Sequence, residues 1–396
     1  MLRNWNRLVS WFFCCLVVFT HTNEGILDMT IQSKFAAFRD SMASWLIERN
    51  DEIDITLAAI VAKQNALFVG PPGVAKSMLA EQIASWIGGR FFNIQVNRFT
   101  APEELFGQLS VKSLKNDEFR RIITGKLADC EVAVIDEIFK ASSAILNTML
   151  RVLNERRYQN GNEDVACPLQ LAIAASNEWP GNQEGGKDLG ALFDRFLIRK
   201  EVKTIKTSAG LDRLLWSDLQ FSPVDKLSIA EIDQANKDAA KIPFAAEAKS
   251  AYEQIVKTCR AQGVFPGDRR LRAGVGVCRA VAWIAGNTEV TPEDCGILAH
   301  ILWDDPQSAG IVAEIVGKIA NPSEMEVNTL LIEANEIINK DGNGEDVAAV
   351  VSATKKLAAI TGKLKKMSGT KADNAVTYVT DETKKLRAMA LGSPVA

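Results

Sequence analysis

Residues 66–77 read ALFVGPPGVAKS and combine an apolar run, a loop of glycine and proline, and the pair Lys76-Ser77. The run Ala66–Val69 has β-type composition, and Met78–Ile87 after the loop has a helical pattern. A glycine-rich loop between a strand and a helix is the setting of a phosphate-binding loop, because its N–H groups turn inward and the helix N-terminus adds a favourable dipole. The sequence therefore predicts a nucleotide site formed by Gly70, Pro71, Pro72, Gly73, Val74, Ala75, Lys76, Ser77 and Met78.

The last residues of this loop have distinct expected roles. Lys76 is expected to reach the β- and γ-phosphates of the nucleotide, and the Ser77 hydroxyl to ligate Mg²⁺. Ala75 stands where the usual pattern has glycine, and we expect its methyl group to be tolerated if the residue keeps helical backbone angles. The competing interpretation is a Gly-Pro turn before a helix with an incidental lysine.

A pair of carboxylates argues against that competing interpretation. The apolar run Val132–Ile135 ends in Asp136-Glu137, about sixty residues after the loop. In open α/β sheets ligands bind at the carboxyl ends of the strands. We expect Asp136 to hold Mg²⁺ through water and Glu137 to polarise the attacking water as general base. The alternative for such a pair, taken alone, is an acidic strand end that serves as the N-cap of a helix.

Other polar residues carry weaker signals. Asn177 follows the apolar run Leu169–Ala175 and suits a residue that orients the lytic water. Arg195 could be an ordinary surface arginine, and Arg269 and Arg270 could be a basic first turn of a helix. These residues gain weight only together.

The alternation of element types predicts the fold class. Between residues 66 and 205, short β-type runs alternate with helical patterns, which predicts a doubly wound, largely parallel α/β sheet. From about residue 207 onward helices dominate, and residues 343–396 look like a helical hairpin. We expect the strands and domains as follows: strands at 66–69, 91–96, 132–135, 169–175 and 196–202; a nucleotide-binding domain with N-terminal helices at 29–206; a helical lid at 207–306; and a helical C-terminal region at 307–396.

Composition limits the function classes. Lys+Arg number 46 and Asp+Glu 49, so the chain has no strongly basic domain of the kind that binds nucleic acid. Two histidines, His21 and His300, argue against a multi-histidine metal centre. Seven scattered cysteines without a C-x-x-C pair indicate free thiols in a reducing compartment, and we expect a cytoplasmic protein.

The N-terminus conflicts with a cytoplasmic location. Arg3 and Arg7 precede the apolar run Leu8–Thr20, which resembles the charged and hydrophobic regions of a signal peptide. The run is shorter than the roughly 20 residues of a membrane-spanning helix, and a secreted protein would meet no ATP. Our hypothesis is that residues 1–28 are a start-site artefact; a membrane-tethering segment is the alternative, although we do not expect membrane association.

Several motifs together resemble the MoxR family of AAA+ ATPases, and most closely its RavA-like branch. The resemblance covers residues 65–200, and its Ala before the phosphate-loop lysine matches Ala75. It rests on GPPGVAKS (70–77), FTAPEELFG (99–107), VAVIDEIFKASSAILNTMLRVLNERRYQNG (132–161), AIAASNEWP (172–180) and LFDRFLIR (192–199).

The resemblance implies roles that the residues alone do not. By matching position, Asn177 resembles sensor 1, Arg195 the arginine finger and Arg269 the sensor-2 arginine, with Arg270 adjacent as a competing choice. It places an insertion at 107–126 and a hairpin at 156–171 near a central pore, and Asn160-Gly161 is a good hairpin turn signal. It also implies ATP and Mg²⁺ as cofactors, a hexamer that remodels proteins, and a partner with a von Willebrand A domain.

Alternative functions remain at this point. A nucleotide-dependent binding module that does not remodel its partner is the main one. A GTPase would be expected to carry Asn-Lys-x-Asp, but in Asn236-Lys237-Asp238 the aspartate comes one position early. A DNA helicase or initiator of the same superfamily is disfavoured by the lack of a basic domain.

Overall fold

A five-stranded parallel sheet carries the residues quoted above. The computed structural model describes residues 30–179, 193, 195–341, 347–367 and 370–390, so the hypothesis about residues 1–28 lies outside the described residues. The strand order is β2-β3-β6-β1-β7, and every neighbouring pair is parallel. The strands are β1 (Ala66–Val69), β2 (Phe91–Gln95), β3 (Val132–Asp136), β6 (Leu171–Ser176) and β7 (Ile198–Glu201). The predicted fold class is therefore confirmed, with each strand end within two residues of its expected place.

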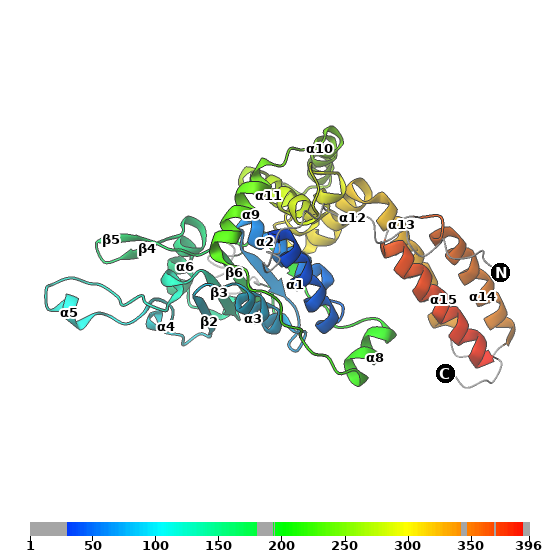
Figure 1. Cartoon of the computed structure of the whole chain (residues 1–396), viewed down its shortest axis with the longest axis horizontal. Helices are drawn as coiled ribbons and strands as arrows, with labels where there is room; N and C mark the ends of the chain where they lie inside the picture. The colour runs from blue at the N-terminus through cyan, green and yellow to red at the C-terminus, as the bar shows by residue number, and fades with distance from the viewer. Residues whose placement is uncertain (1–29, 180–192, 194, 342–346, 368–369, 391–396) are drawn as a thin grey trace, which may run out of the picture.

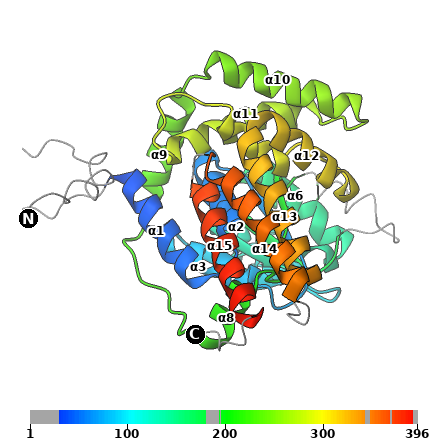
Figure 2. The same ribbon diagram turned by 90° about the vertical axis from the view of Figure 1, so that its right-hand side faces the viewer.

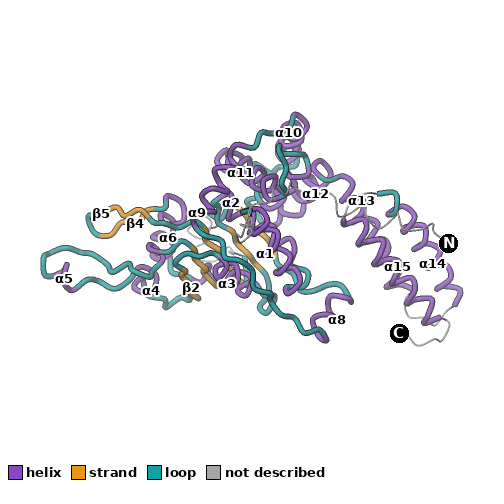
Figure 3. Tube along the Cα trace, viewed as in Figure 1, coloured by secondary structure: helices purple, strands orange, loops and turns teal. Residues whose placement is uncertain are grey.

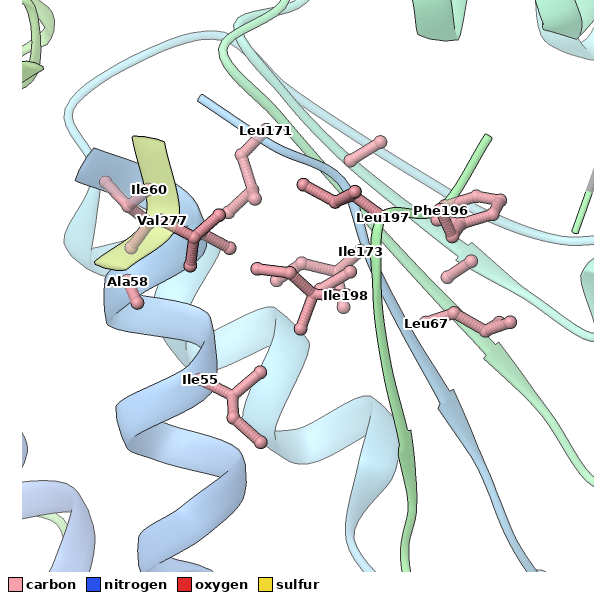
Figure 4. Close-up of a cluster of buried hydrophobic side chains, with 14 of the residues drawn as sticks. Ile55, Ala58, Ile60, Leu67, Leu171, Ile173, Phe196, Leu197, Ile198 and Val277 are labelled. Atoms are coloured by element: carbon pink, nitrogen blue, oxygen red, sulfur yellow. The ribbon is translucent and has the colours of Figure 1, made fainter. Parts of the chain in front are cut away.

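Helices cover both faces of this sheet, which explains why its strands are almost continuously apolar. All four residues of β1 and all six of β6 are buried. Ile55 and Ala58 of the neighbouring helix α2 lie on the side of the sheet toward which Ile198 points, whereas Leu67 points to the opposite side (Figure 4). The helices between the start of the described chain and the hairpin are α1 (Ile31–Trp45), α2 (Asn50–Ala62), α3 (Lys76–Trp86), α4 (Pro102–Phe106) and α6 (Ser143–Glu155), together with the short α5 (Val111–Leu114), which lies apart from the sheet in a projecting loop (Figure 1).

The predicted helical lid follows the last strand. Helix α8 (Ser208–Trp216) projects from the body (Figure 1), whereas α9 and α11 pack against α2, and α10 and α12 pack against each other and the turn η3. These helices and short 3₁₀ turns are α9 (Ile229–Lys241), α10 (Ala246–Ala261), α11 (Asp268–Ile284), α12 (Ala309–Ala320), η3 (Glu293–His300) and η4 (Pro306–Ser308), while η1 (Leu127–Asp129) and η2 (Ile138–Lys140) flank β3.

The C-terminal region is a bundle of its own. Its helices α13 (Pro322–Asp341), α14 (Val347–Leu364) and α15 (Thr370–Ala390) lie side by side (Figure 2) and share a separate hydrophobic core from Val327 to Leu386. The expected two-helix hairpin thus gains α13 as a third helix. Because α12 buries Val312 and Val316 in the core of the body, we place the division between lid and C-terminal region after α12 rather than at 306–307.

A β-hairpin and a long loop project at the other end of the molecule from this bundle (Figure 3). The hairpin strands are β4 (Arg157–Asn160) and β5 (Glu163–Ala166), so the predicted turn at Asn160-Gly161 is confirmed. The Arg121 N–H donates to Asn160 Oδ1 at 2.7 Å and joins the loop to the hairpin. The insertion and the hairpin expected from the resemblance therefore form one composite projection.

The described ranges also bear on the thiols and on membrane spans. Five cysteines, Cys130, Cys167, Cys259, Cys278 and Cys295, are buried and free. Within those ranges no helix combines the length and the apolarity that crossing a membrane requires.

Candidate nucleotide-binding site

The phosphate loop connects the carboxyl end of β1 to the N-terminus of α3. Its first glycine is enforced by packing, because a Cβ atom at Gly70 would lie 2.1 Å from the carbonyl oxygen of Val202. The Gly70 N–H donates to the Ser176 carbonyl at 3.1 Å, which ties the loop to β6. Gly73 has φ +80°, the left-handed region that glycine adopts without strain. The backbone of the loop is thus set by β6, β7 and its glycines.

Ala75 does not keep the helical angles that the sequence led us to expect. It has φ 67° and ψ 22°, in the left-handed region. That conformation costs an L-residue about 1–2 kcal/mol. The reason is positional: Ala75 is the N-cap of α3, where the loop must turn before the helix begins. Glu137 is also left-handed, with φ 53°, and such strain clusters at functional sites.

Lys76 lies across the mouth of the loop. Its Nζ donates to the carbonyl oxygens of Gly70 at 2.7 Å and Pro71 at 2.9 Å, and to Asn177 Oδ1 at 3.0 Å. Burial lowers the pKa of Lys76, while the charges of Asp136 and Glu137 oppose that effect. A phosphate group in the loop would replace these neutral oxygens with charged ones, which a partly buried ammonium binds more strongly.

Ser77 and Asp136 provide oxygen ligands suited to Mg²⁺. Ser77 Oγ donates to Asp136 Oδ2 at 2.9 Å, and Asp136 Oδ1 accepts from the Glu137 N–H at 2.9 Å. Among the described residues, no cluster of three His, Cys, Asp or Glu side chains could hold a metal by itself. This donor set fits Mg²⁺, which is usually bound by one or two protein oxygens together with waters and substrate phosphates.

Asn177 joins the lysine to the second carboxylate. Its Nδ2 donates to Glu137 Oε1, while its Oδ1 accepts from Lys76. Glu137 Oε2 is 3.4 Å from the Nζ of Lys140, and the Glu137 side chain is buried. The structure therefore brings together the ends of β1, β3 and β6 that the sequence predicted separately.

These residues form one end of a cavity of about 820 Å³. That volume is within the range of small-molecule sites, roughly 300–1,000 Å³. The phosphate loop, Asp136, Glu137 and Asn177 make its polar end. Apolar side chains line the remainder: Trp45, Leu46, Ile47, Ile205, Leu211, Leu214 and Leu219. No motif marks these residues in the sequence; they come from the end of α1 and the turn after it, and from the segment after β7 that contains α8.

Arg49 is a further residue that sequence reasoning missed. It is buried, and its guanidinium donates to the Val74 carbonyl at 3.1 Å and to the Lys203 carbonyl at 2.8 Å. It thereby joins the phosphate loop to the segment after β7. Its only signal in the sequence is a charged residue between two helical patterns.

The predicted arginines lie elsewhere in the chain. The cavity lining includes neither Arg195 nor Arg269, both of which belong to the described ranges. Arg269 is exposed and donates to Asn154 Oδ1 at 3.0 Å. Arg195 Nε is shielded from solvent and has no hydrogen-bond partner among the described residues. Both arginines thus lie outside the lining of the cavity that the phosphate loop of their own chain forms.

Arg270 differs from Arg269 in a way the sequence could not show. Its side chain is 4% exposed, and its guanidinium contacts the carbonyls of Leu197 and Ile301 and the carboxylate of Asp304. These contacts give Arg270 a structural role between the lid and β7. Of the two adjacent arginines, Arg269 is the one that faces solvent.

Two protein-family models match the chain. Residues 33–239 match the model described as the MoxR domain in the MoxR-vWA-beta-propeller ternary systems. Residues 249–316 match the model of an AAA lid domain.

Individual relatives agree with these matches. An uncharacterised protein of Methanocaldococcus jannaschii is 39% identical over 293 residues, which is 74% of this chain and 76% of that protein. The chaperone MoxR1 of Mycobacterium tuberculosis is 27% identical over 158 residues, 40% of this chain and 41% of that protein. A candidate ATPase of known crystal structure, from Cytophaga hutchinsonii, has TM-score 0.57 and 16% identity, covering 73% of this chain and 94% of its own. That last likeness concerns the fold.

Proposed function

The chain belongs to the MoxR family of AAA+ ATPases, and from this premise we propose that it hydrolyses Mg-ATP and works as a hexameric, chaperone-like remodeller of partner proteins. The RavA-like branch stays a prediction. The observation that carries the proposal is the hydrogen-bonded group at the polar end of the cavity: Lys76 to Asn177, Asn177 to Glu137, and Ser77 to Asp136.

Glu137 is our proposed general base, and its hydrogen bond with Asn177 links it to Lys76. Asn177 and Lys140 engage both carboxylate oxygens of Glu137. When Lys76 and Asn177 turn toward a γ-phosphate, Glu137 Oε1 is released to accept a proton from the attacking water. Ser77 and Asp136 would hold Mg²⁺, which neutralises charge on the β- and γ-phosphates when bound. Catalysis then consists of positioning and charge stabilisation.

The positions of Arg195 and Arg269 support an oligomer. Neither lines the cavity of its own chain, whereas an arginine finger must reach the γ-phosphate. We assign Arg195 as a finger for the site of a neighbouring subunit, and Arg269 as a sensor-2 arginine that acts across the same contact. A ring in which each subunit completes the site of the next satisfies both assignments.

The partner and the location follow from the family. The matching model describes systems that contain MoxR, von Willebrand A and beta-propeller components, so we propose a von Willebrand A domain protein as partner. Because the cycle consumes ATP, we place the protein in the cytoplasm.

The direct test is steady-state hydrolysis of ATP by the wild-type protein in the presence of Mg²⁺. Lys76→Ala should weaken ATP binding and with it the rate, because it removes the cation at the mouth of the loop. Lys356→Ala, an exposed lysine in α14, is the matched control and should leave both unchanged. Replacing ATP by GTP tests whether the site selects adenine over guanine. The proposal is overturned if the wild type shows no Mg²⁺-dependent hydrolysis at all protein concentrations tested, including those at which it assembles.

A nucleotide-dependent switch without remodelling is the second candidate. It is favoured by the hydrogen bonding of Glu137, whose carboxylate oxygens are both engaged within the chain. A switch would bind ATP tightly and turn over at most once, whereas a remodeller turns over repeatedly and faster with its client present. Single-turnover and multiple-turnover rates separate the two.

A further inference from the structure

Four aromatic side chains pack together beside the nucleotide site. The Trp179 ring contacts Phe193 edge-on at 5.9 Å between centroids, and Trp303 edge-on at 5.7 Å. Phe193 lies 6.1 Å from Trp303 and 6.3 Å from Phe139. Pairs of this geometry are favourable beyond the area they bury. We call Phe139, Trp179, Phe193 and Trp303 the aromatic cluster.

Three members of the aromatic cluster are adjacent in sequence to residues assigned to hydrolysis. Phe139 follows Glu137 by two residues, and Trp179 follows Asn177 by two. Phe193 precedes Arg195 by two residues. The proposed base, the proposed sensor and the proposed finger thus each have an aromatic neighbour in the same packed group.

Arg199 fixes the aromatic cluster to the lid. Its guanidinium carbon lies 3.9 Å from the centroid of Phe193 and 5.4 Å from that of Trp303. The same guanidinium donates to the Trp303 carbonyl at 2.7 Å and to the Phe196 carbonyl at 2.9 Å. Arg199 is 1% exposed, and close-packed groups of this kind change between discrete arrangements rather than deforming continuously.

We propose that the aromatic cluster positions Arg195 and makes that position depend on the nucleotide held by the same subunit. Glu137 and Asn177 change partners when a γ-phosphate binds or leaves, and Phe139 and Trp179 carry that change to Phe193 and hence to the finger. Trp303 brings the lid into the same contact. The four residues of the aromatic cluster are positioning residues, not catalytic ones. The inference rests on the proposed function, in which Arg195 serves the neighbouring subunit.

Mixed oligomers provide the test. Arg195→Ala subunits retain a working site but lack a finger, and Glu137→Gln subunits retain a finger but lack a base. Mixing them should restore hydrolysis at interfaces that pair an intact Glu137 with an intact Arg195. Trp179→Leu is then added to one partner or to the other. Nucleotide binding and assembly are measured for every variant, so that a subunit that fails to fold or assemble is recognised.

The expected result differs between the two partners, because only the Glu137→Gln partner supplies the finger whose position is tested. Trp179→Leu in the Glu137→Gln partner should lower the restored rate by about 10²-fold, the effect of displacing a catalytic group by about 1 Å. Trp179→Phe in that partner should recover most of the rate, because a ring remains in contact with Phe193 and Trp303. Trp303→Leu should repeat the loss from the lid side. Phe244→Leu, which alters a ring packed against Tyr252 in the lid, is the matched control and should restore as the parent does.

The opposite outcomes are equally specific. If Glu137→Gln, Trp179→Leu subunits restore hydrolysis as well as Glu137→Gln subunits, the aromatic cluster does not position the finger and the inference is wrong. If Trp179→Leu and Trp303→Leu subunits both fail to assemble and Trp179→Phe in the Glu137→Gln partner recovers none of the lost rate, the cluster is structural only and the inference is wrong. If the parent mixture restores nothing, the finger does not act between subunits, and the proposed function in that respect falls together with this inference.

Discussion

The residues assigned to hydrolysis fall into two groups at opposite ends of the strands. We call these ends the carboxyl edge and the amino edge of the sheet. One group lies at the carboxyl ends of β1, β3 and β6, where hydrogen bonds join Lys76 to Asn177, Asn177 to Glu137, and Ser77 to Asp136. The other group lies toward the amino end of β7: Arg195 precedes that strand by three residues, and Arg269 is adjacent to the structural Arg270, which contacts the Leu197 carbonyl just before β7.

Under the proposed function, one chain therefore holds a complete binding site and an incomplete catalytic one. The carboxyl-edge group can bind nucleotide and magnesium within a single subunit. Arg195 and Arg269 do not line that cavity, and in the proposed function they act on another copy. Binding and turnover should therefore respond differently to changes at the two edges, and the following predictions use that difference.

The largest effect is expected at the amino edge. Arg195→Ala should bind ATP as the wild type does but hydrolyse it about 10³–10⁵-fold more slowly, the range for arginine fingers in related enzymes. Specific activity of the wild type should rise with protein concentration, because each site needs its neighbour. ATP affinity and kcat measured across a dilution series check both statements. A fully active dilute monomer, or a wild-type rate in Arg195→Ala, would contradict them.

The next effect is expected at the carboxyl edge. Glu137→Gln should keep ATP binding, since the phosphate and magnesium contacts survive, and lose about 10²–10⁴-fold in kcat with the general base. Equal losses in binding and turnover would instead mean that Glu137 is structural. Glu253→Gln, an exposed carboxylate in the lid helix α10, is the control for the change of charge.

Adjacent arginines at the amino edge should separate stability from activity. Arg270→Ala leaves the buried carbonyls of Leu197 and Ile301 without their donor, which should lower the free energy of unfolding by about 1–3 kcal/mol. Arg269→Ala removes an exposed side chain and should change stability by about 0.5 kcal/mol or less. In the assembled protein, however, Arg269→Ala should reduce kcat. Urea denaturation and ATPase rates on both variants test the contrast, and the reverse pattern would assign sensor 2 to Arg270.

The pH dependence of folding offers a smaller test, away from both groups. Burial, helped by the charge of Lys200 and opposed by Asp51, lowers the pKa of His300 to about 3. An unfolded histidine titrates near 6.5, so between 6.5 and 3 the unfolded chain binds a proton that the folded chain does not. Stability from this residue is complete above pH 6.5 and falls as the pH drops toward 3, by about 1.4 kcal/mol per unit. Between pH 7.5 and 5.5 the wild type should therefore lose about 1.4 kcal/mol more than His300→Gln in urea denaturation, while ATP binding at pH 7.5 is equal.

The sequence could predict the carboxyl edge because backbone geometry determines it. A parallel sheet brings the ends of its strands to one edge, so a loop, an acidic pair and an asparagine that each follow a strand must meet there. The amino-edge arginines are placed instead by tertiary packing. Nothing in the local pattern distinguishes exposed Arg269 from Arg270, which is buried against two carbonyls. Arg49 escaped prediction for the same reason, since its partners Val74 and Lys203 are distant in sequence.

The left-handed backbone of Ala75 is a feature of the carboxyl edge that the sequence did not predict. Changing it yields the smallest expected effect. Ala75 adopts φ 67°, which costs an L-residue about 1–2 kcal/mol, whereas glycine there would give back about 0.5–1 kcal/mol through the greater freedom of the unfolded chain. Ala75→Gly should therefore raise the free energy of unfolding by about 1 kcal/mol or less. ATP affinity should change little, because the loop already holds the conformation that glycine would favour. Val74→Gly is the control, since Val74 does not have a positive φ and its side chain is buried, so that change should destabilise. If Ala75→Gly also destabilises, the packing of the Ala75 methyl group outweighs the cost of the left-handed conformation, and the expectation of a gain in stability is wrong.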